Sequence, residues 1–152
     1  MRKLFKFNDH GFTLIEIIVT LAIGTIVMTA IGTFLVRNLH YNNMAQDQVF
    51  IQDQVRYAIK GMTEMVMEKK TVNPTASGAK FNSGIAGELE ISWNSGTKEL
   101  KYDNGTNEGV LAKNITNFLV VKNTDNLITV TIEGTKEKAK FKAVEKIHLR
   151  NR

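Results

Sequence analysis

A run of 20 uncharged residues, Ile17 to Val36, limits what this chain can fold into more than any other feature. At about 1.5 Å rise per residue, a helix of this length spans roughly 30 Å, the hydrocarbon thickness of a bilayer. Before the run stand Arg2, Lys3 and Lys6 with one acid, Asp9. An excess of Lys and Arg on a short flank keeps that end in the cytoplasm. The sequence therefore predicts one membrane-spanning helix with its N-terminus inside the cell.

A removed secretory signal peptide is the main alternative, because it also has a basic start and an apolar stretch. That stretch is usually about 7 to 15 residues long and ends at a small-residue cleavage site. Here the run is longer, contains Gly24 and Gly32, and leads into Arg37 and a polar segment. These features favour an anchor that stays in the protein.

One acid, Glu16, directly precedes the uncharged run and follows the apolar residues Leu14 and Ile15. A charged side chain at bilayer depth costs about 2.5 to 3.5 kcal/mol on insertion scales, so it persists where a partner or a function compensates. We expect the partner to be a positive charge that is absent from the chain as it is synthesised and arises later.

The segment from Lys6 to Glu16, KFNDHGFTLIE, resembles the class III signal sequence of type IV prepilins and of the pseudopilins of type II secretion and competence systems. The resemblance rests on a basic leader, Gly11, Phe12, then Thr-Leu-Ile-Glu and a long apolar run. It implies that a membrane-embedded prepilin peptidase cuts between Gly11 and Phe12 on the cytoplasmic side and N-methylates Phe12. Residues 1–11 would then be a cleaved leader, and residues 12–36 the transmembrane half of a long helix.

Cleavage after Gly11 would create an α-amino group with a pKa of about 8, largely cationic at neutral pH. Glu16 lies four residues beyond Phe12, one helical turn away. The amine of its own chain and that of a neighbouring subunit are equally good partners by this spacing. Because such a pair must offset its desolvation, we expect Glu16 to fix the axial register between subunits rather than to add net stability.

Beyond Arg37 the helical pattern continues as the soluble half of the same helix, residues 37–70. Its apolar stripe recurs at helical spacing and comprises Met44, Ile51, Val55, Ala58, Ile59, Met62, Met65 and Val66. Lys69 and Lys70 suit a helix C-terminus, and Asn73-Pro74 closes the segment because the residue before Pro avoids the α region.

Residues 71–152 are expected to form a loop and the antiparallel sheet of a globular head. Residues 71–87 are rich in Gly, Ser, Thr and Asn and predict one irregular connection. A period of two then predicts a hairpin over 88–102, with its turn at Asn94-Ser95-Gly96-Thr97. Further strands are expected at 110–115, 118–121, 127–133 and 139–149. The fold class is therefore α+β, a long N-terminal helix packed on a four- or five-stranded antiparallel sheet, and this order resembles the pilin fold.

Positive charge is concentrated near the C-terminus, where Lys136, Lys138, Lys140 and Lys142 stand at every second position. In a strand these four side chains would line one face. A solvated face that discourages edge-to-edge aggregation is favoured. The alternative is phosphate contact with DNA, but no aromatic platform is interleaved with the lysines.

No pattern in the sequence predicts an enzyme, a metal site or a cofactor. His10, His40 and His148 are scattered, and Glu16 has no second carboxylate in the anchor for acid/base chemistry. The chain contains no cysteine, so no disulfide can stabilise the head.

The resemblance implies a structural subunit of a type IV pilus or of a type II secretion or competence pseudopilus. The expected partners are prepilin peptidase, other pilin or pseudopilin subunits and the inner-membrane assembly platform. The protein would be a single-pass cytoplasmic membrane protein first and part of a cell-surface or periplasmic filament later. Val110-Leu111-Ala112 and the ending Leu149-Arg150-Asn151-Arg152 resemble minor pilins and J-type minor pseudopilins, which favours an initiating or tip subunit. A single-pass surface binding protein and a DNA-uptake pseudopilin that uses the basic C-terminal strand are the alternatives.

Overall fold

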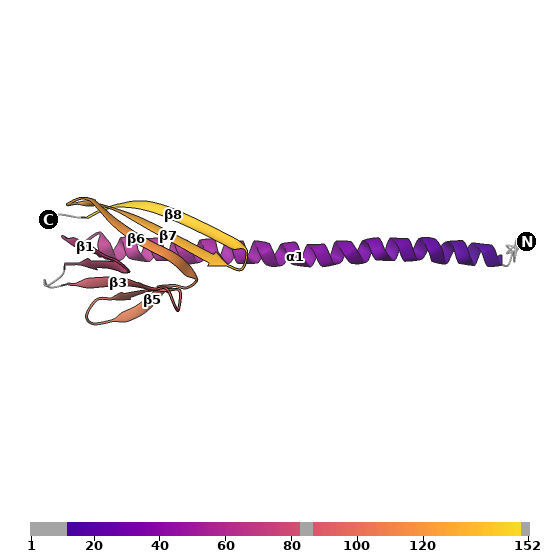
Figure 1. Cartoon of the computed structure of the whole chain (residues 1–152), viewed down its shortest axis with the longest axis horizontal. Helices are drawn as coiled ribbons and strands as arrows, with labels where there is room; N and C mark the ends of the chain where they lie inside the picture. The colour runs from indigo at the N-terminus through magenta and orange to yellow at the C-terminus, as the bar shows by residue number, and fades with distance from the viewer. Residues whose placement is uncertain (1–11, 83–86, 150–152) are drawn as a thin grey trace, which may run out of the picture. The chain divides into compact units, whose positions relative to one another are not determined.

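The computed structural model describes residues 12–82 and 87–149 (Figure 1). The expected leader, including Gly11, lies outside the described residues. By their contacts the residues divide into two units, Met1–Asn42 and Asn43–Arg152. Each unit is described by itself.

The helix α1 runs over Leu14–Val66, so its first part belongs to the first unit. Its threonines donate their hydroxyls to backbone carbonyls of the preceding turn: Thr20 to Glu16 at 2.6 Å and Thr25 to Ala22 at 2.8 Å. Thr29 bonds the carbonyl of Thr25 at 2.7 Å. Since hydrocarbon offers no partners to a polar group, these internal bonds make the threonines compatible with a membrane-spanning helix.

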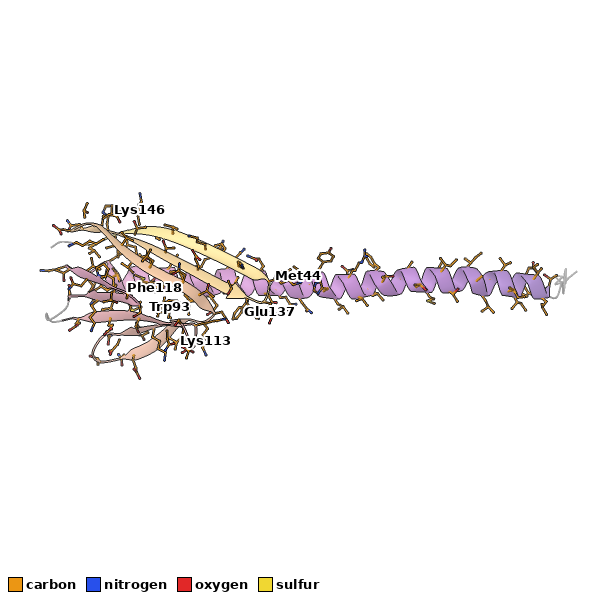
Figure 2. The ribbon with its side chains drawn as sticks, viewed as in Figure 1. Met44, Trp93, Lys113, Phe118, Glu137 and Lys146 are labelled. Atoms are coloured by element: carbon orange, nitrogen blue, oxygen red, sulfur yellow. The ribbon has the colours of Figure 1, made fainter. Side chains whose placement is uncertain are left out.

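The remainder of α1 contributes one apolar face to the core of the second unit. The fully buried side chains on this face are Ile51, Val55, Ala58, Met62 and Val66. Ile59 and Met65 are partly buried against the same core, as the stripe predicted. Met44 was expected in the stripe but is 40% exposed, so the buried face begins one heptad later, at Ile51 (Figure 2 labels Met44).

The helix ends four residues earlier than predicted, at Val66 rather than at Lys70. A turn forms instead, in which the Lys69 amide donates to the Val66 carbonyl at 2.9 Å. The next two amides, of Lys70 and Thr71, donate to the side-chain oxygen of Asn82 at 2.8 and 3.3 Å. The helix therefore stops because a distant side chain binds the amides that would have continued it.

The prediction of one irregular connection over residues 71–87 is wrong, because this segment contains two strands. β1, Val72–Thr75, pairs antiparallel with β2, Gly78–Phe81. Pro74 cannot donate a ladder hydrogen bond, but β1 is an edge strand, where proline is tolerated. Gly78 packs so tightly that a Cβ would lie 2.1 Å from the Ile91 carbonyl oxygen, which is why a glycine stands there.

A five-stranded sheet has the order β1-β2-β3-β4-β5. It continues with β3, Leu89–Asn94, β4, Glu99–Asp103, and β5, Glu108–Ala112. The predicted hairpin is confirmed as β3 and β4, with Trp93 opposite Leu100. Its turn is held by Asn94, whose side-chain oxygen accepts from the amides of Gly96 and Thr97 at 2.9 and 3.1 Å.

A separate three-stranded sheet has the order β6-β7-β8. Its strands are β6, Ile115–Thr124, β7, Leu127–Lys136, and β8, Ala139–His148. The expected single sheet is therefore two sheets. The chain leaves the first ladder at Asn114, which has φ 60°, and Ile115 then donates its amide to the Lys98 carbonyl at 2.9 Å.

One core joins the helix and the inner faces of both sheets. Phe118 of β6 is buried in it, and the Trp93 indole of β3 donates to the Ile115 carbonyl at 3.0 Å across the junction (Figure 2 labels Trp93 and Phe118). The architecture is α+β and pilin-like, as predicted.

Candidate functional site

The N-terminal end of α1 is closed by a reciprocal pair of side chains, Thr13 and Glu16. The Thr13 amide and hydroxyl both donate to Glu16 Oε2 at 2.9 Å. The Glu16 amide donates in return to Thr13 Oγ1 at 3.3 Å. Thr13 is thus the N-cap and Glu16 the third helical residue of a capping box, which satisfies donors that a helix start otherwise leaves unpaired.

Only one oxygen of the Glu16 carboxylate is used by this arrangement. Both bonds from Thr13 reach Oε2, and among the described residues no donor bonds Oε1. Glu16 also lies in the first turn of the helix, where a negative charge is favourable to the macrodipole. The geometry therefore holds the carboxylate in place and leaves one oxygen for a cation.

The capping box was missed by the sequence reasoning, which considered only an amine as the partner of Glu16. Its signal is in the sequence, because Thr13-Leu14-Ile15-Glu16 before an apolar run is the S/T-x-x-E pattern of a helix start. The side chain that binds Glu16 in the structure is the hydroxyl-bearing neighbour three residues before it.

Apolar side chains around the first part of α1 are exposed, from Leu14 at 78% to Val36 at 68%. Within the described residues, α1 is long enough and apolar enough to cross a membrane. Phe12, the expected methylated residue, precedes the helix and is 83% exposed. Gly11, the other half of the expected cleavage site, lies outside the described part.

The four alternate lysines do not line one face of one strand, so that prediction is wrong. Lys136 is the last residue of β7, Lys138 stands in the turn after Glu137, and only Lys140 and Lys142 belong to β8. Glu137 has φ 51° and reverses the chain between the strands (Figure 2 labels Glu137). A turn therefore interrupts the alternation that the sequence pattern assumed to be continuous.

Two of these lysines are engaged within the protein. Lys136 Nζ lies 2.9 Å from Asp47 Oδ1 and 4.3 Å from the centre of the Phe50 ring, both on α1. Lys142 Nζ lies 2.7 Å from Glu133 Oε1. The hydrogen bond from Lys142 holds the pKa of Glu133 below its ordinary value. Lys136 thus connects the β7–β8 hairpin to α1, and Lys142 joins its two strands. Phosphate contact by the four lysines stays the untested alternative to a solvated face.

The described residues contain no group of three or more His, Cys, Asp or Glu side chains that could hold a metal ion. A shallow hollow of about 400 Å³ lies on the five-stranded sheet, lined in part by Glu90, Asp103, Glu108 and Val110. It is open to solvent.

The geometry defines an α+β protein whose N-terminal helix can anchor it in a membrane. That helix begins with a capping box formed by Thr13 and Glu16. The model of the prokaryotic N-terminal methylation motif matches residues 6–32. The chain therefore carries a class III signal sequence, which confirms the resemblance and supports a type IV pilin or pseudopilin precursor. Such a signal implies processing by prepilin peptidase and assembly with other pilins, and the proteins that carry it are structural. Searches of curated proteins and of solved structures found no match.

Proposed function

We propose that this chain is the precursor of a filament subunit that is cut between Gly11 and Phe12, N-methylated at Phe12, and assembled through the apolar part of α1. Residues 1–11 are the leader in this proposal, and residues 12–36 cross the membrane once. The mature side chains then carry a net charge of +3 instead of +5, because the leader takes three cations and one acid with it.

The observation that carries the proposal is the methylation motif over residues 6–32. The motif ends within α1, and the Glu16 carboxylate lies in the first turn of that helix. Glu16 is held by Thr13 through Oε2, and its Oε1 accepts nothing from the described residues. The amine that cleavage creates at Phe12 is the cation that this oxygen fits. A neighbouring subunit can supply it as well as the same chain.

Van der Waals packing between apolar helix faces in a membrane does not by itself fix how far one helix slides along the next. A charge pair does fix it, because misplacement leaves a charge in hydrocarbon without its partner. In this proposal Glu16 therefore sets the axial register of one subunit against its neighbour.

The subtype proposed is a minor, initiating or tip subunit of a pilus, secretion or competence system. Its support is the resemblance of Val110-Leu111-Ala112 and of the C-terminal residues to minor pilins and J-type pseudopilins. In this proposal the subunit waits in the cytoplasmic membrane with its N-terminus inside. It then meets the assembly platform and leaves in a cell-surface or periplasmic filament.

Mass spectrometry of the N-terminus tests the processing step. The full chain is expressed with and without a prepilin peptidase. We expect a mature chain beginning with N-methylated Phe12 only when the peptidase is present. A chain that begins at Met1 under both conditions would support a single-pass surface binding protein instead.

Replacing Glu16 by Gln tests the register role separately from helix capping. Gln serves at the third position of a capping box as Glu does, so Glu16→Gln keeps the helix start and removes the charge. We expect normal removal of the leader and a loss of incorporation into filaments of at least tenfold, measured in sheared or cross-linked material.

The matched control is Thr13→Ser, which keeps both the hydroxyl cap and the charge and should assemble normally. Glu16→Leu removes the charge and the cap together and should assemble no better than Glu16→Gln. Normal incorporation of Glu16→Gln would show that Glu16 acts in capping alone.

A further inference from the structure

The outer face of the three-stranded sheet exposes an apolar patch. In register across the strands, Leu119 lies opposite Thr131, and Thr131 opposite Val144. The next row places Val121 opposite Thr129 and Thr129 opposite Lys146. Leu119, Val121 and Val144 are 50%, 44% and 55% exposed. Single exposed apolar side chains need no explanation, but a group on adjacent rows of one face is typical of an interaction surface.

Positive charge borders this patch along β8. Lys140, Lys142 and Lys146 point to the same side as Val144, since side chains two residues apart in a strand share a face. Lys142 is paired with Glu133. Lys140 and Lys146 form no ion pair with any residue that the structure describes (Figure 2 labels Lys146). We call Leu119, Val121, Val144 and Lys146 the β6–β8 outer face.

The five-stranded sheet carries the opposite charge on its own outer face. Its register places Lys80 beside Glu90, Glu90 beside Asp103, and Asp103 beside Glu108. Like charges directly opposite one another destabilise a sheet. Lys80 Nζ lies 2.9 Å from Glu90 Oε2, whereas Asp103 and Glu108 have no ion pair within residues 12–82 and 87–149.

These carboxylates line the hollow described above, and Val110 at its rim is 46% exposed. Lys101 also lines the hollow, but its ammonium lies 3.5 Å from Glu99. We call Glu90, Asp103, Glu108 and Val110 the carboxylate hollow. Among the described residues, one sheet thus presents an apolar surface beside cations that form no ion pair, and the other presents an acidic hollow with an apolar rim.

We propose that the β6–β8 outer face of one copy of this chain packs on the carboxylate hollow of a second copy. Lys146 meets Asp103 and Glu108 of the second copy, and Val144 packs against its Val110. The contact relieves the opposed carboxylates and covers apolar area on both copies, and its matched charges select this pairing over others. It deepens the proposed function and rests on it only for placing two copies in one cytoplasmic membrane; it does not require two copies side by side in one filament, where a tip subunit would have other subunits as neighbours.

Disulfide trapping tests the contact, because the chain has no cysteine of its own. Two full-length variants, Val144→Cys and Val110→Cys, are co-expressed with the peptidase, and their membranes are mildly oxidised. Cross-linking requires Cα atoms within about 7 Å, so a mixed dimer reports direct contact. We expect this dimer from the pair and none from either variant alone. Val144→Cys with Asn73→Cys, on the edge strand of the same five-stranded sheet, is the matched control and should give none.

Charge exchange tests the specificity of the same dimer. Lys146→Glu in the Val144→Cys copy should lower the yield at least roughly twofold, the scale of one exposed ion pair. Glu108→Lys in the Val110→Cys copy should restore it. A yield insensitive to Lys146→Glu would overturn the proposed pairing.

Leader removal is measured in the same samples and separates the two proposals. No mixed dimer from chains that begin at Phe12 and assemble would overturn this contact and leave the proposed function standing. Cross-linking of either cysteine to a different protein instead would also overturn it. A chain that keeps its leader contradicts the proposed function itself.

Discussion

Gly134 of β7 shows how tightly one residue can fix the packing of the head. A Cβ at this position would lie 2.7 Å from Ile51 Cδ1 and 2.9 Å from Ile51 Cγ1, on the buried face of α1. Ile51 is fully buried, and the same Cβ would also lie 3.1 Å from Val55 Cγ2. The strand can approach the helix because this residue has no side chain.

We expect Gly134→Ala to lower the free energy of unfolding by about 1 to 3 kcal/mol, the cost of overpacking a filled core. Chemical unfolding of the full chain in detergent, followed by the fluorescence of Trp93, the one tryptophan of the sequence, measures it.

Gly61→Ala is the matched control, because its Cβ would meet the tip of the half-buried Leu111 side chain at 3.2 Å. That tip can shift, and Ala favours a helix over Gly by about 1 kcal/mol. We therefore expect no loss of stability from Gly61→Ala. Equal losses from both variants would contradict this account of Gly134.

At the scale of elements, Asn82 decides where α1 stops and the first sheet begins. Its side-chain oxygen accepts from the backbone amides of Lys70 and Thr71, and the backbone amide of Asn82 donates to the Thr71 carbonyl at 3.1 Å. Its φ of 53° is one that Asn adopts more readily than most residues. The buried Asn82 side chain thus supplies the hydrogen-bond acceptor for two backbone amides just after the end of the helix.

We expect Asn82→Ala to destabilise the head by about 1 to 3 kcal/mol, because two amides lose their acceptor and the left-handed backbone becomes strained. Asn82→Asp keeps an oxygen at the same place and tolerates the same φ, so its loss should be smaller. The same unfolding measurement compares the two. Equal destabilisation would show that the acceptor oxygen is not what holds this turn.

At the scale of the whole molecule, the two units depend on different residues. The described hydrogen bonds of Glu16 reach only Thr13 and Thr20, whereas the core of the head is built entirely from residues of the second unit. Processing and register are therefore proposed to depend on the first unit, and the stability of the head on the second.

A reciprocal pair of variants checks this independence. Glu16→Gln should leave the unfolding midpoint of the head unchanged while it reduces assembly. Gly134→Ala should lower that midpoint while the leader is still removed. A shift of the head's midpoint in Glu16→Gln would contradict the separation.

Periodicity gave most of the secondary structure correctly, because a helix and a strand expose their apolar residues at different spacings. The buried stripe from Ile51 to Val66 and the hairpin around Asn94 follow this rule. The rule failed at β1, where an edge position allows Pro74 in a strand, and at Glu137, where a turn interrupts alternate lysines.

At the candidate site, the motif around Gly11, Phe12 and Glu16 could be read from the sequence because it is continuous in the chain. The pairing of Glu16 with Thr13 was also readable but was overlooked in favour of the amine. The ion pairs of Lys136 with Asp47 and of Lys142 with Glu133 were not predictable, since each joins different elements.

The sequence alone therefore determined the apolar anchor, the acid at its start and the α+β class, because these depend on the order and spacing of nearby residues. Within residues 12–82 and 87–149, the tertiary structure decided where the helix ends, how the eight strands divide into two sheets, and which charges remain unpaired on their outer faces. Those features depend on contacts between distant residues, such as Asn82 with Lys70 and Trp93 with Ile115, whose free energy exists only once the chain has folded.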